Sequence, residues 1–196
     1  MPNPPTQPPV KLDYSTPAPK GRTPLYLALA FAAVGVFALT MNLMDSGRPR
    51  PVANRVKCAS NLRQIGQAIL LYSNDNSGQY PPDLGTLLLT EEITSEVFTC
   101  PSSNDTRAIG ATTQTVVNEM AKPGHLSYIY LGKGLNAKTI SPNTVVAYEP
   151  LSNHDGDGSN VLFADGHVEF LQSNQIRILE AKLRSSTGPT TLPDSP

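Results

Sequence analysis

The sequence predicts an α+β fold, in which a long amphipathic helix packs on a small antiparallel sheet and a last helix closes the domain. Three observations lead to this fold: helical spacing of apolar residues over 54–74, β-rich runs at 126–131 and 144–148, and a hairpin signal at 160–171. The same prediction places a single transmembrane helix over residues 24–45, ahead of the folded domain.

The first part of the chain contains a proline-rich segment, an apolar stretch and a linker. Residues 1–23 are polar and rich in proline, so they bury too little apolar surface to fold and are predicted to be disordered. From Leu25 to Met44 run twenty residues without a charge, enough to cross roughly 30 Å of hydrocarbon as a helix. A cleaved signal peptide is the alternative, but its apolar region is usually shorter and ends at a small-x-small site. Residues 46–53, with one glycine and two prolines, are predicted to be a linker.

Charge is distributed unevenly along the chain. Residues 1–57 contain seven Lys and Arg against two Asp, whereas residues 58–196 contain eight basic and fourteen acidic side chains. The acidic folded part argues against nucleic acid as a partner, because nucleic-acid binding needs clustered basic side chains. Three basic residues precede the apolar stretch and four follow it, so this count does not orient a membrane helix.

The folded domain is predicted to cover residues 54–184. Its expected elements are a helix over 54–74, a short helix over 83–92, strands over 96–99, 126–131 and 144–148, the hairpin, and a helix over 173–184. Ser173 is the expected N-cap of the last helix. Residues 102–122 are expected to form a long loop, and residues 185–196 a disordered tail.

The hairpin is the most specific local signal. Asp165 and Gly166 lie between two apolar runs, and an Asp-Gly pair favours a two-residue type I′ turn. In that register, one face is wholly apolar and is expected to face the core; it consists of Val161, Phe163, Val168 and Phe170. His167 and Glu169 would lie on the other, wetter face.

Three segments together resemble a known family. They begin Cys58-Ala-Ser-Asn-Leu-Arg-Gln, Gln79-Tyr-Pro-Pro-Asp-Leu and Phe98-Thr-Cys-Pro-Ser, and they resemble the bacterial, planctomycete-type prepilin or pseudopilin-like proteins. Those proteins are related to the major pseudopilin of type II secretion and have a His, nine residues and an Asp-Gly pair near the C-terminus. His154 and the pair at 165–166 are similar to this motif, with ten intervening residues, and the resemblance covers about residues 58–172.

The resemblance implies a single-pass protein of the cytoplasmic membrane with a periplasmic C-terminal domain. It also implies secretion or pilus-like apparatus components as partners. At the N-terminus, Gly21 and Thr23 match the prepilin cleavage pattern, whereas Pro24 is foreign to it and Tyr26 replaces the Glu used in assembly. These departures weigh against cleavage after Gly21.

Cys58 and Cys100 are the two cysteines of the chain. In the oxidising compartment that the resemblance implies, an even pair favours a disulfide. Such a bond would stabilise the domain by roughly 4 kcal/mol in the chain-entropy model. The alternative is two unpaired thiols, with Cys58 buried on its helix as a small apolar residue.

Acidic and histidine side chains are concentrated between residues 149 and 169. This group invites a metallohydrolase hypothesis, and its members are Glu149, His154, Asp155, Asp157, Asp165, His167 and Glu169. No nucleophile motif accompanies them, and nothing in the sequence makes three or four ligands converge. We therefore predict no catalytic residue and no required cofactor.

Calcium is the milder metal hypothesis. Asp155, Asp157 and Ser159 space oxygen donors at alternate positions, although Asn160 stands where an EF-hand loop has glycine. The major pseudopilin that the chain resembles binds calcium in a loop of its C-terminal sheet. The alternative is a glycine-rich loop held by local side-chain to backbone hydrogen bonds.

Three functions from different classes remain open at this point. The first is a membrane-anchored, pseudopilin-like structural protein of a type II secretion or pilus-like system, without catalytic activity. The second is a solitary envelope-facing domain that binds a ligand or partner and forms no filament. The third is a metal-dependent envelope enzyme.

Overall fold

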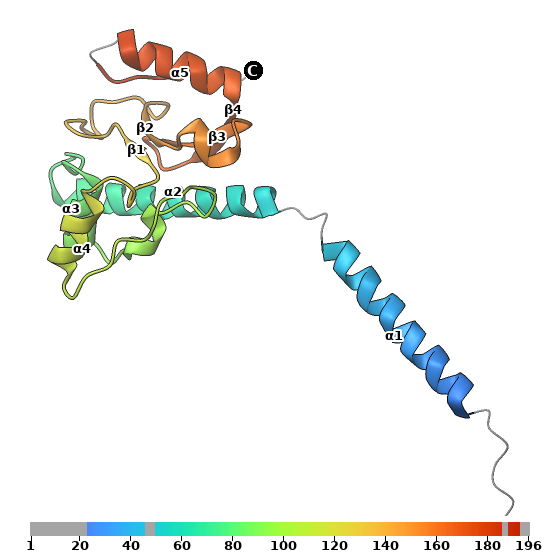
Figure 1. Cartoon of the computed structure of the whole chain (residues 1–196). Helices are drawn as coiled ribbons and strands as arrows, with labels where there is room; N and C mark the ends of the chain where they lie inside the picture. Colours follow the sequence, from blue (N-terminus) through green and yellow to red (C-terminus); the bar gives the residue numbers. More distant parts are fainter. Residues whose placement is uncertain (1–22, 46–49, 186–187, 193–196) are drawn as a thin grey trace, which may run out of the picture. The chain divides into compact units, whose positions relative to one another are not determined.

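The computed structural model describes residues 23–45, 50–185 and 188–192 (Figure 1). The chain divides into two units, Met1–Arg48 and Pro49–Pro196. In the described part of the first unit, α1 runs over Thr23–Asp45. The predicted disordered segment 1–23 lies outside the described residues, apart from the first residue of α1.

The second unit combines helices with one sheet. Its elements are α2 (Arg50–Asp75), α3 (Leu84–Thr90), η1 (Ser95–Phe98), α4 (Thr113–Met120), β1 (Ile129–Tyr130), β2 (Val145–Tyr148), η2 (Leu151–His154), β3 (Gly158–Phe163), β4 (Val168–Gln172) and α5 (Ser173–Ser185). The four strands pair in the order β1-β2-β3-β4, each antiparallel to its neighbour. The unit is therefore α+β, with a meander sheet.

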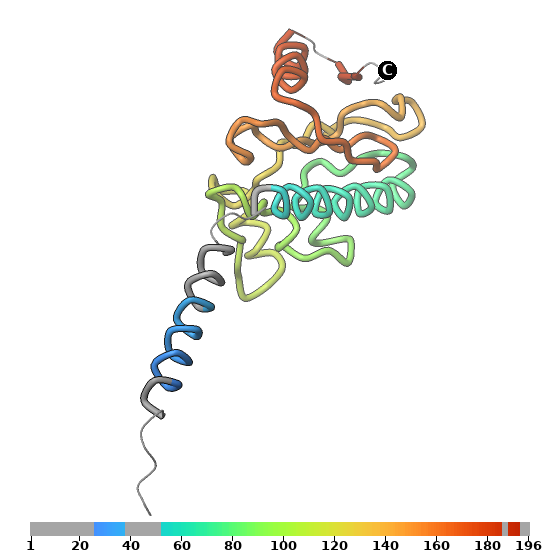
Figure 2. Tube along the Cα trace, turned by 90° about the vertical axis from the view of Figure 1, so that its right-hand side faces the viewer, coloured from blue at the N-terminus to red at the C-terminus, as the bar shows by residue number. Residues whose placement is uncertain are grey.

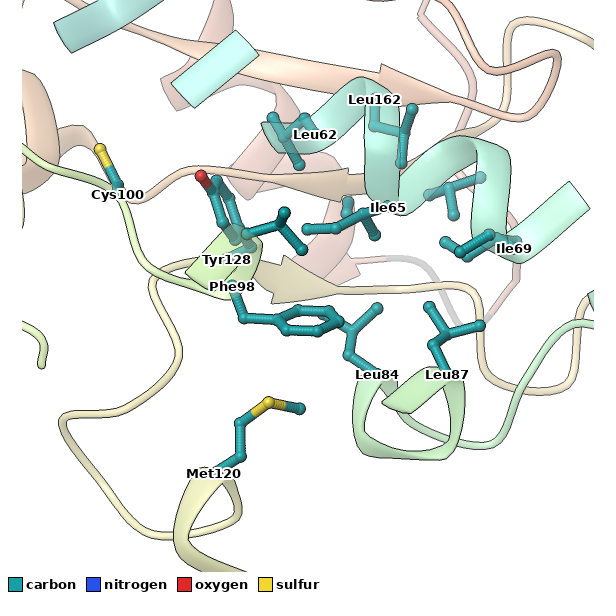
Figure 3. Close-up of a cluster of buried hydrophobic side chains, with 14 of the residues drawn as sticks. Leu62, Ile65, Ile69, Leu84, Leu87, Phe98, Cys100, Met120, Tyr128 and Leu162 are labelled. Atoms are coloured by element: carbon teal, nitrogen blue, oxygen red, sulfur yellow. The ribbon is translucent and has the colours of Figure 1, made fainter. Parts of the chain in front are cut away.

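Helix α2 covers one face of this sheet (Figures 1 and 2). Its apolar stripe, including Leu62, Ile65 and Ile69, is fully buried against Leu162 of β3. Beyond the helix, side chains of α3, η1 and α4 complete the same core; among them are Leu84, Leu87, Phe98 and Met120 (Figure 3). The stripe follows the three- and four-residue spacing that the sequence indicates.

Helix α5 covers the opposite face of the sheet (Figures 1 and 2). Ile176 and Leu179 are fully buried there against Val161, Phe163 and Leu171. All six residues of β3 are buried, because the strand is covered on both faces. The fold thus has three layers, with the sheet in the middle.

The predicted hairpin register is wrong by one residue. Phe163 donates its backbone N–H to His167 O, and Leu162 pairs with Val168, so the loop has three residues with Gly166 at φ +89°. A three-residue loop with glycine in the left-handed region is the next most common hairpin connection after the two-residue one.

Because of this shift, the residues of the expected apolar face are divided between the two faces of the sheet, one covered by α2 and the other by α5. Val161 and Phe163 face α5, whereas Val168 packs in the core under α2. The expectation of a single buried sheet face is therefore wrong, since each face has its own helix.

The predicted transmembrane helix is also corrected. Residues 24–45 are helical in α1, but within the described ranges no helix is long and apolar enough to cross a membrane. A span needs about 20 consecutive apolar residues, and the described side chains of α1 cover residues 26–37 only. The membrane-spanning part of the fold prediction is thus wrong, and so is the predicted single-pass location in the cytoplasmic membrane with a periplasmic domain.

Several boundaries differ from the predicted ones. Helix α2 begins at Arg50, inside the predicted linker, because proline is tolerated in the first turn of a helix. The strand expected over 96–99 is the 3-10 helix η1, and the loop expected over 102–122 contains α4, which a Thr112–Thr115 capping box starts. In the predicted tail, Thr191 pairs with Thr144 next to the sheet.

The three-layer arrangement predicts a large effect at one α5 position. Leu179→Ala should lower the free energy of unfolding by about 2–5 kcal/mol, because it empties a fully buried site. Ile178→Ala is the matched control, since the neighbouring Ile178 is 54% exposed. Chemical denaturation of both variants checks this, and equal losses would contradict burial of the α5 face.

The hairpin turn predicts a second difference. Gly166→Val should destabilise the protein by about 1–3 kcal/mol, because a β-branched residue is forced to positive φ. Its Cβ would also lie 3.1 Å from Leu70 Cδ1. His167→Ala should cost only about 0.5 kcal/mol, because that side chain is half-exposed. Thermal melts of the two variants compare their melting temperatures. A larger decrease for His167→Ala than for Gly166→Val would refute this account of the turn.

Candidate functional site

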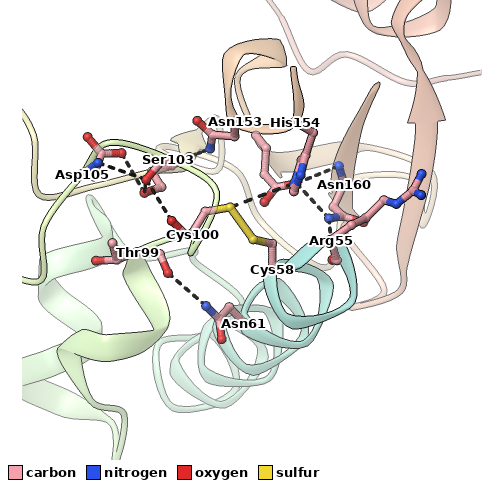
Figure 4. The surroundings of a disulfide bond; sticks show 12 residues. Arg55, Cys58, Asn61, Thr99, Cys100, Ser103, Asp105, Asn153, His154 and Asn160 are labelled. Atoms are coloured by element: carbon pink, nitrogen blue, oxygen red, sulfur yellow. Dashed lines mark hydrogen bonds and ion pairs between the residues drawn. A yellow bond between two sulfur atoms is a disulfide. The ribbon is translucent and has the colours of Figure 1, made fainter. Parts of the chain in front are cut away.

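Four side chains with metal-ligating or redox chemistry meet at one place. They come from α2, from the second residue after η1, from the residue after β2 and from the end of η2. They are Cys58, Cys100, Glu149 and His154, and all four are buried. Their ligand atoms, one from each residue, all lie within 4.8 Å of one another. We call this group the Cys–Glu–His cluster; Cys58, Cys100 and His154 are labelled in Figure 4.

The predicted disulfide is present in this cluster. Cys58 and Cys100 are bonded, with their Cα atoms 5.3 Å apart, a separation usual for disulfides. The bond ties the N-terminal half of α2 to the chain that follows η1. Asn61, one turn further along α2, supports the same junction by donating to the backbone carbonyl of Thr99 at 3.2 Å.

Glu149 supplies the buried carboxyl group of the cluster, with a side chain that is 0% exposed. Its Oε2 accepts hydrogen bonds from His154 Nε2 at 3.0 Å, from the backbone N–H of Asn160 at 3.0 Å and from Asn160 Nδ2 at 2.8 Å. Its Oε1 has no hydrogen-bond partner within the described residues. Burial of a carboxylate requires such partners, since an uncompensated charge in the interior is costly.

Asn160 connects this carboxylate to the long helix. The same Nδ2 that donates to Glu149 also donates to the backbone carbonyl of Arg55 on α2 at 3.1 Å. The guanidinium of Arg55 in turn lies 4.2 Å from the ring centroid of Phe170, a cation–π contact. The cluster is thereby attached to α2 by a disulfide and by hydrogen bonds.

A pocket of about 190 Å³ opens beside His154. It is lined by Asn54, Arg55, Ser102, Asn153, His154, Asp155, Asp157 and Phe170. Asn153 is held in place by donating to the backbone carbonyl of Ser127 at 3.0 Å. The pocket therefore offers cationic, anionic and aromatic groups above the buried cluster.

The calcium candidates lie in different environments. Asp155, which has φ +54°, and Asp157 are exposed at the pocket, whereas Ser159 is fully buried in β3. The structure thus places the two carboxylates at one opening and the hydroxyl inside the sheet. Calcium binding stays a prediction.

The His and Asp-Gly residues of the resemblance motif have separate roles. His154 belongs to the cluster, while Asp165 and Gly166 form the β3–β4 turn. Partial burial acts to raise the pKa of Asp165, but hydrogen bonds from the backbone and ring of His167 outweigh it and lower that pKa. His167 also stacks on Phe163, with ring centroids 4.3 Å apart. Of the residues behind the metallohydrolase hypothesis, Glu149 and His154 form the only pair within the cluster.

Two residues of the site escaped the sequence analysis in their actual roles. Glu149 enters the sequence analysis as a member of the metallohydrolase group and Asn160 as a residue of the calcium hypothesis, yet both are buried hydrogen-bonding partners. A polar residue immediately after a β-rich run is the one local signal that points to Glu149. Its partner lies eleven residues away, and only the pairing of β2 with β3 brings the two together.

No protein-family model matches the chain, and neither a curated protein nor a solved structure is significantly similar to it. The resemblance to pseudopilin-like proteins therefore stays a prediction.

The hydrogen bonds of Glu149 predict its contribution to stability. Glu149→Ala should lower the free energy of unfolding by about 2–4 kcal/mol, because the buried donors of Asn160 and His154 lose their acceptor. Glu92→Ala is the control, since Glu92 is an exposed residue. Urea denaturation measures the free energy of unfolding of both variants. A decrease for Glu149→Ala no larger than that for Glu92→Ala would show that the hydrogen bonds of this carboxylate do not stabilise the fold.

Proposed function

We propose that the chain is a pseudopilin-like structural protein that assembles with other subunits through α1 and displays its second unit. In this proposal the protein acts as a component of a type II secretion or pilus-like apparatus. Its function is subunit packing and presentation of a rigid domain, without a chemical step.

The observation that carries the proposal is the surface of α1. Over residues 26–37, the described side chains of the helix are all exposed, and most are apolar. Leu27, Phe31 and Val34 are 59%, 75% and 65% exposed. A helix that is apolar all round is stable only when something covers it, and contiguous apolar surface marks an interaction site.

Copies of the same helix are the occupant that α1 fits best. Ala28, Ala32 and Gly35 are spaced by four and three residues and therefore share one face of α1, where a second helix can approach closely. Gly35 has open space around it, with nothing within 4 Å of a Cβ placed there. In the ordinary mode of helix association, rows of side chains on one helix pack into the grooves between the rows of side chains on its partner.

The second unit supports the proposal in two ways. Its disulfide and its two-sided core make it a rigid body suited to display. Near the start of α2, Val52 and Val56 are 48% and 62% exposed and lie one turn apart, which adds apolar surface for a neighbouring subunit.

A solitary binding domain is the second candidate, and the pocket beside His154 favours it. Arg55, Asp155 and Asp157 would then bind a small polar ligand or a peptide. This function requires no contact between α1 helices of different copies, which separates it from the first by experiment.

Cysteine cross-linking tests the assembly proposal. Single cysteines placed in turn at positions 26–37 of the full chain in cells should give disulfide-linked dimers that recur every three or four residues, because one face of each helix meets its neighbour. The chain without added cysteines is the baseline, since Cys58 and Cys100 are bonded to each other in the oxidised chain and should give no dimer. Non-reducing gels of the cell extracts are the measurement.

Ile178→Cys is the matched control, because Ile178 is likewise an exposed apolar residue on a helix. It should give no dimer. Dimers at none of the α1 positions, or equal dimer formation at Ile178, would reject assembly through α1 and leave the solitary binding domain.

A further inference from the structure

We propose that the reduced chain binds a divalent cation of the zinc class through Cys58, Cys100, Glu149 and His154, and that formation of the disulfide releases it. The cluster is then a metal site in one redox state and a covalent cross-link in the other. This inference is independent of the assembly proposed for α1.

The distances suit a tetrahedral site. His154 Nε2 lies 3.0 Å from Glu149 Oε2 and 4.0 Å from Cys100 Sγ, and the four ligand atoms all lie within 4.8 Å of one another. Zinc bonds of about 2.0–2.3 Å place neighbouring ligand atoms roughly 3.3–3.8 Å apart in a tetrahedron. Once the sulfur–sulfur bond is broken, shifts of about 1 Å bring the four atoms to that spacing.

Glu149 provides an observation that is separate from this proximity. Its side chain is 0% exposed, and its Oε1 has no hydrogen-bond partner in the described part of the chain. Buried carboxylate oxygens are ordinarily paired, so the unpaired Oε1 leaves this carboxylate available to a cation, and one of its oxygens lies within 4.8 Å of both sulfurs and the imidazole nitrogen. Asn160 keeps its two hydrogen bonds to Oε2 and orients the carboxylate, as outer partners of metal ligands do.

The donor set selects the kind of ion. Two thiolates and an imidazole are ligands that suit Zn²⁺ and disfavour Ca²⁺ and Mg²⁺, which take oxygen ligands. Four protein ligands leave no open position, so the ion is structural and not catalytic. The pocket beside His154, with the exposed carboxylates of Asp155 and Asp157, provides a route for the ion.

The redox step balances with a dithiol reductant as the co-reactant. The reductant transfers two electrons and two protons to the disulfide and becomes a disulfide itself, leaving two thiols in the protein. Binding of the cation displaces one proton from each thiol. The proton that His154 Nε2 donates to Glu149 in the oxidised chain is released to solvent while Nδ1 takes one up, so the imidazole stays neutral and Nε2 is free to bind the ion. A disulfide-containing oxidant removes the two electrons again, joins the sulfurs and expels the ion.

Cobalt is the spectroscopic probe for this site. The purified full chain is compared in its oxidised form and after reduction by a dithiol that is then removed under anaerobic conditions. The reduced chain should show the absorption bands of tetrahedral Co²⁺ with thiolate ligands, Zn²⁺ should displace them, and reoxidation should abolish them. The oxidised chain should show none.

Variants assign the other two ligands. Glu149→Gln and His154→Ala should each weaken Co²⁺ binding by at least about 10- to 100-fold. That is the loss in metal affinity when a residue that only hydrogen-bonds to a metal ligand is removed, and a ligand should matter at least as much. His125→Ala is the control, because His125 interacts with Thr106 outside the cluster, and it should bind as the unmutated chain does.

Equal Co²⁺ binding by the oxidised and reduced chains, or a reduced chain without thiolate bands, would overturn the proposal. Unchanged binding by both Glu149→Gln and His154→Ala would overturn the assigned ligands. The comparison of redox states in the unmutated chain decides the matter even where a variant fails to fold.

Discussion

The buried carboxylate of Glu149 is the interaction on which the arrangement of the second unit depends. Removing an ion from water costs several kcal/mol, so its position must be fixed by groups that compensate it. His154 and Asn160 provide them, and they belong to η2 and β3, which the chain reaches only after leaving β2. The carboxylate thereby sets the course of the chain between these two strands.

The same place joins the sheet to the long helix. Asn160 donates to the backbone of α2 through Arg55, and the disulfide holds Cys58 of α2 against Cys100. One link is polar and the other covalent, and the apolar stripe of α2 lies beside both. The hydrogen bond of Asn160 and the disulfide together explain how a sheet of four short strands is held as a rigid body. A small sheet buries little apolar surface without such links to a helix.

The two units of the chain differ in how much of their apolar surface is buried within the chain. The second unit covers both faces of its sheet with helices, so its large apolar side chains are mostly inside. Helix α1 leaves its described apolar side chains exposed, and such a surface calls for partners outside the chain. The assembly proposed for α1 and the redox-dependent metal binding proposed for the second unit therefore rest on different parts of the chain and can be tested separately.

Local sequence patterns were sufficient for features that depend on nearby residues. The three- and four-residue spacing in α2, the glycine of the β3–β4 turn and the N-terminal start of α5 at Ser173 all follow from backbone geometry within one or two turns. The two cysteines also limited the disulfide to a single pairing. The expected membrane span, by contrast, rested on composition alone, and the described helices do not provide it.

The sequence by itself thus determined helices α2, α3 and α5 and the presence of one small sheet, because periodicity and turn residues act locally, whereas η1 and α4 were not predicted. The tertiary structure decided the one-residue register of the hairpin, the cover of the second sheet face by α5 and the burial of Glu149. Each of these depends on contacts between residues far apart in the chain. An Asp-Gly turn is compatible with two loop lengths, and only the packing of α2 and α5 against opposite faces selects between them.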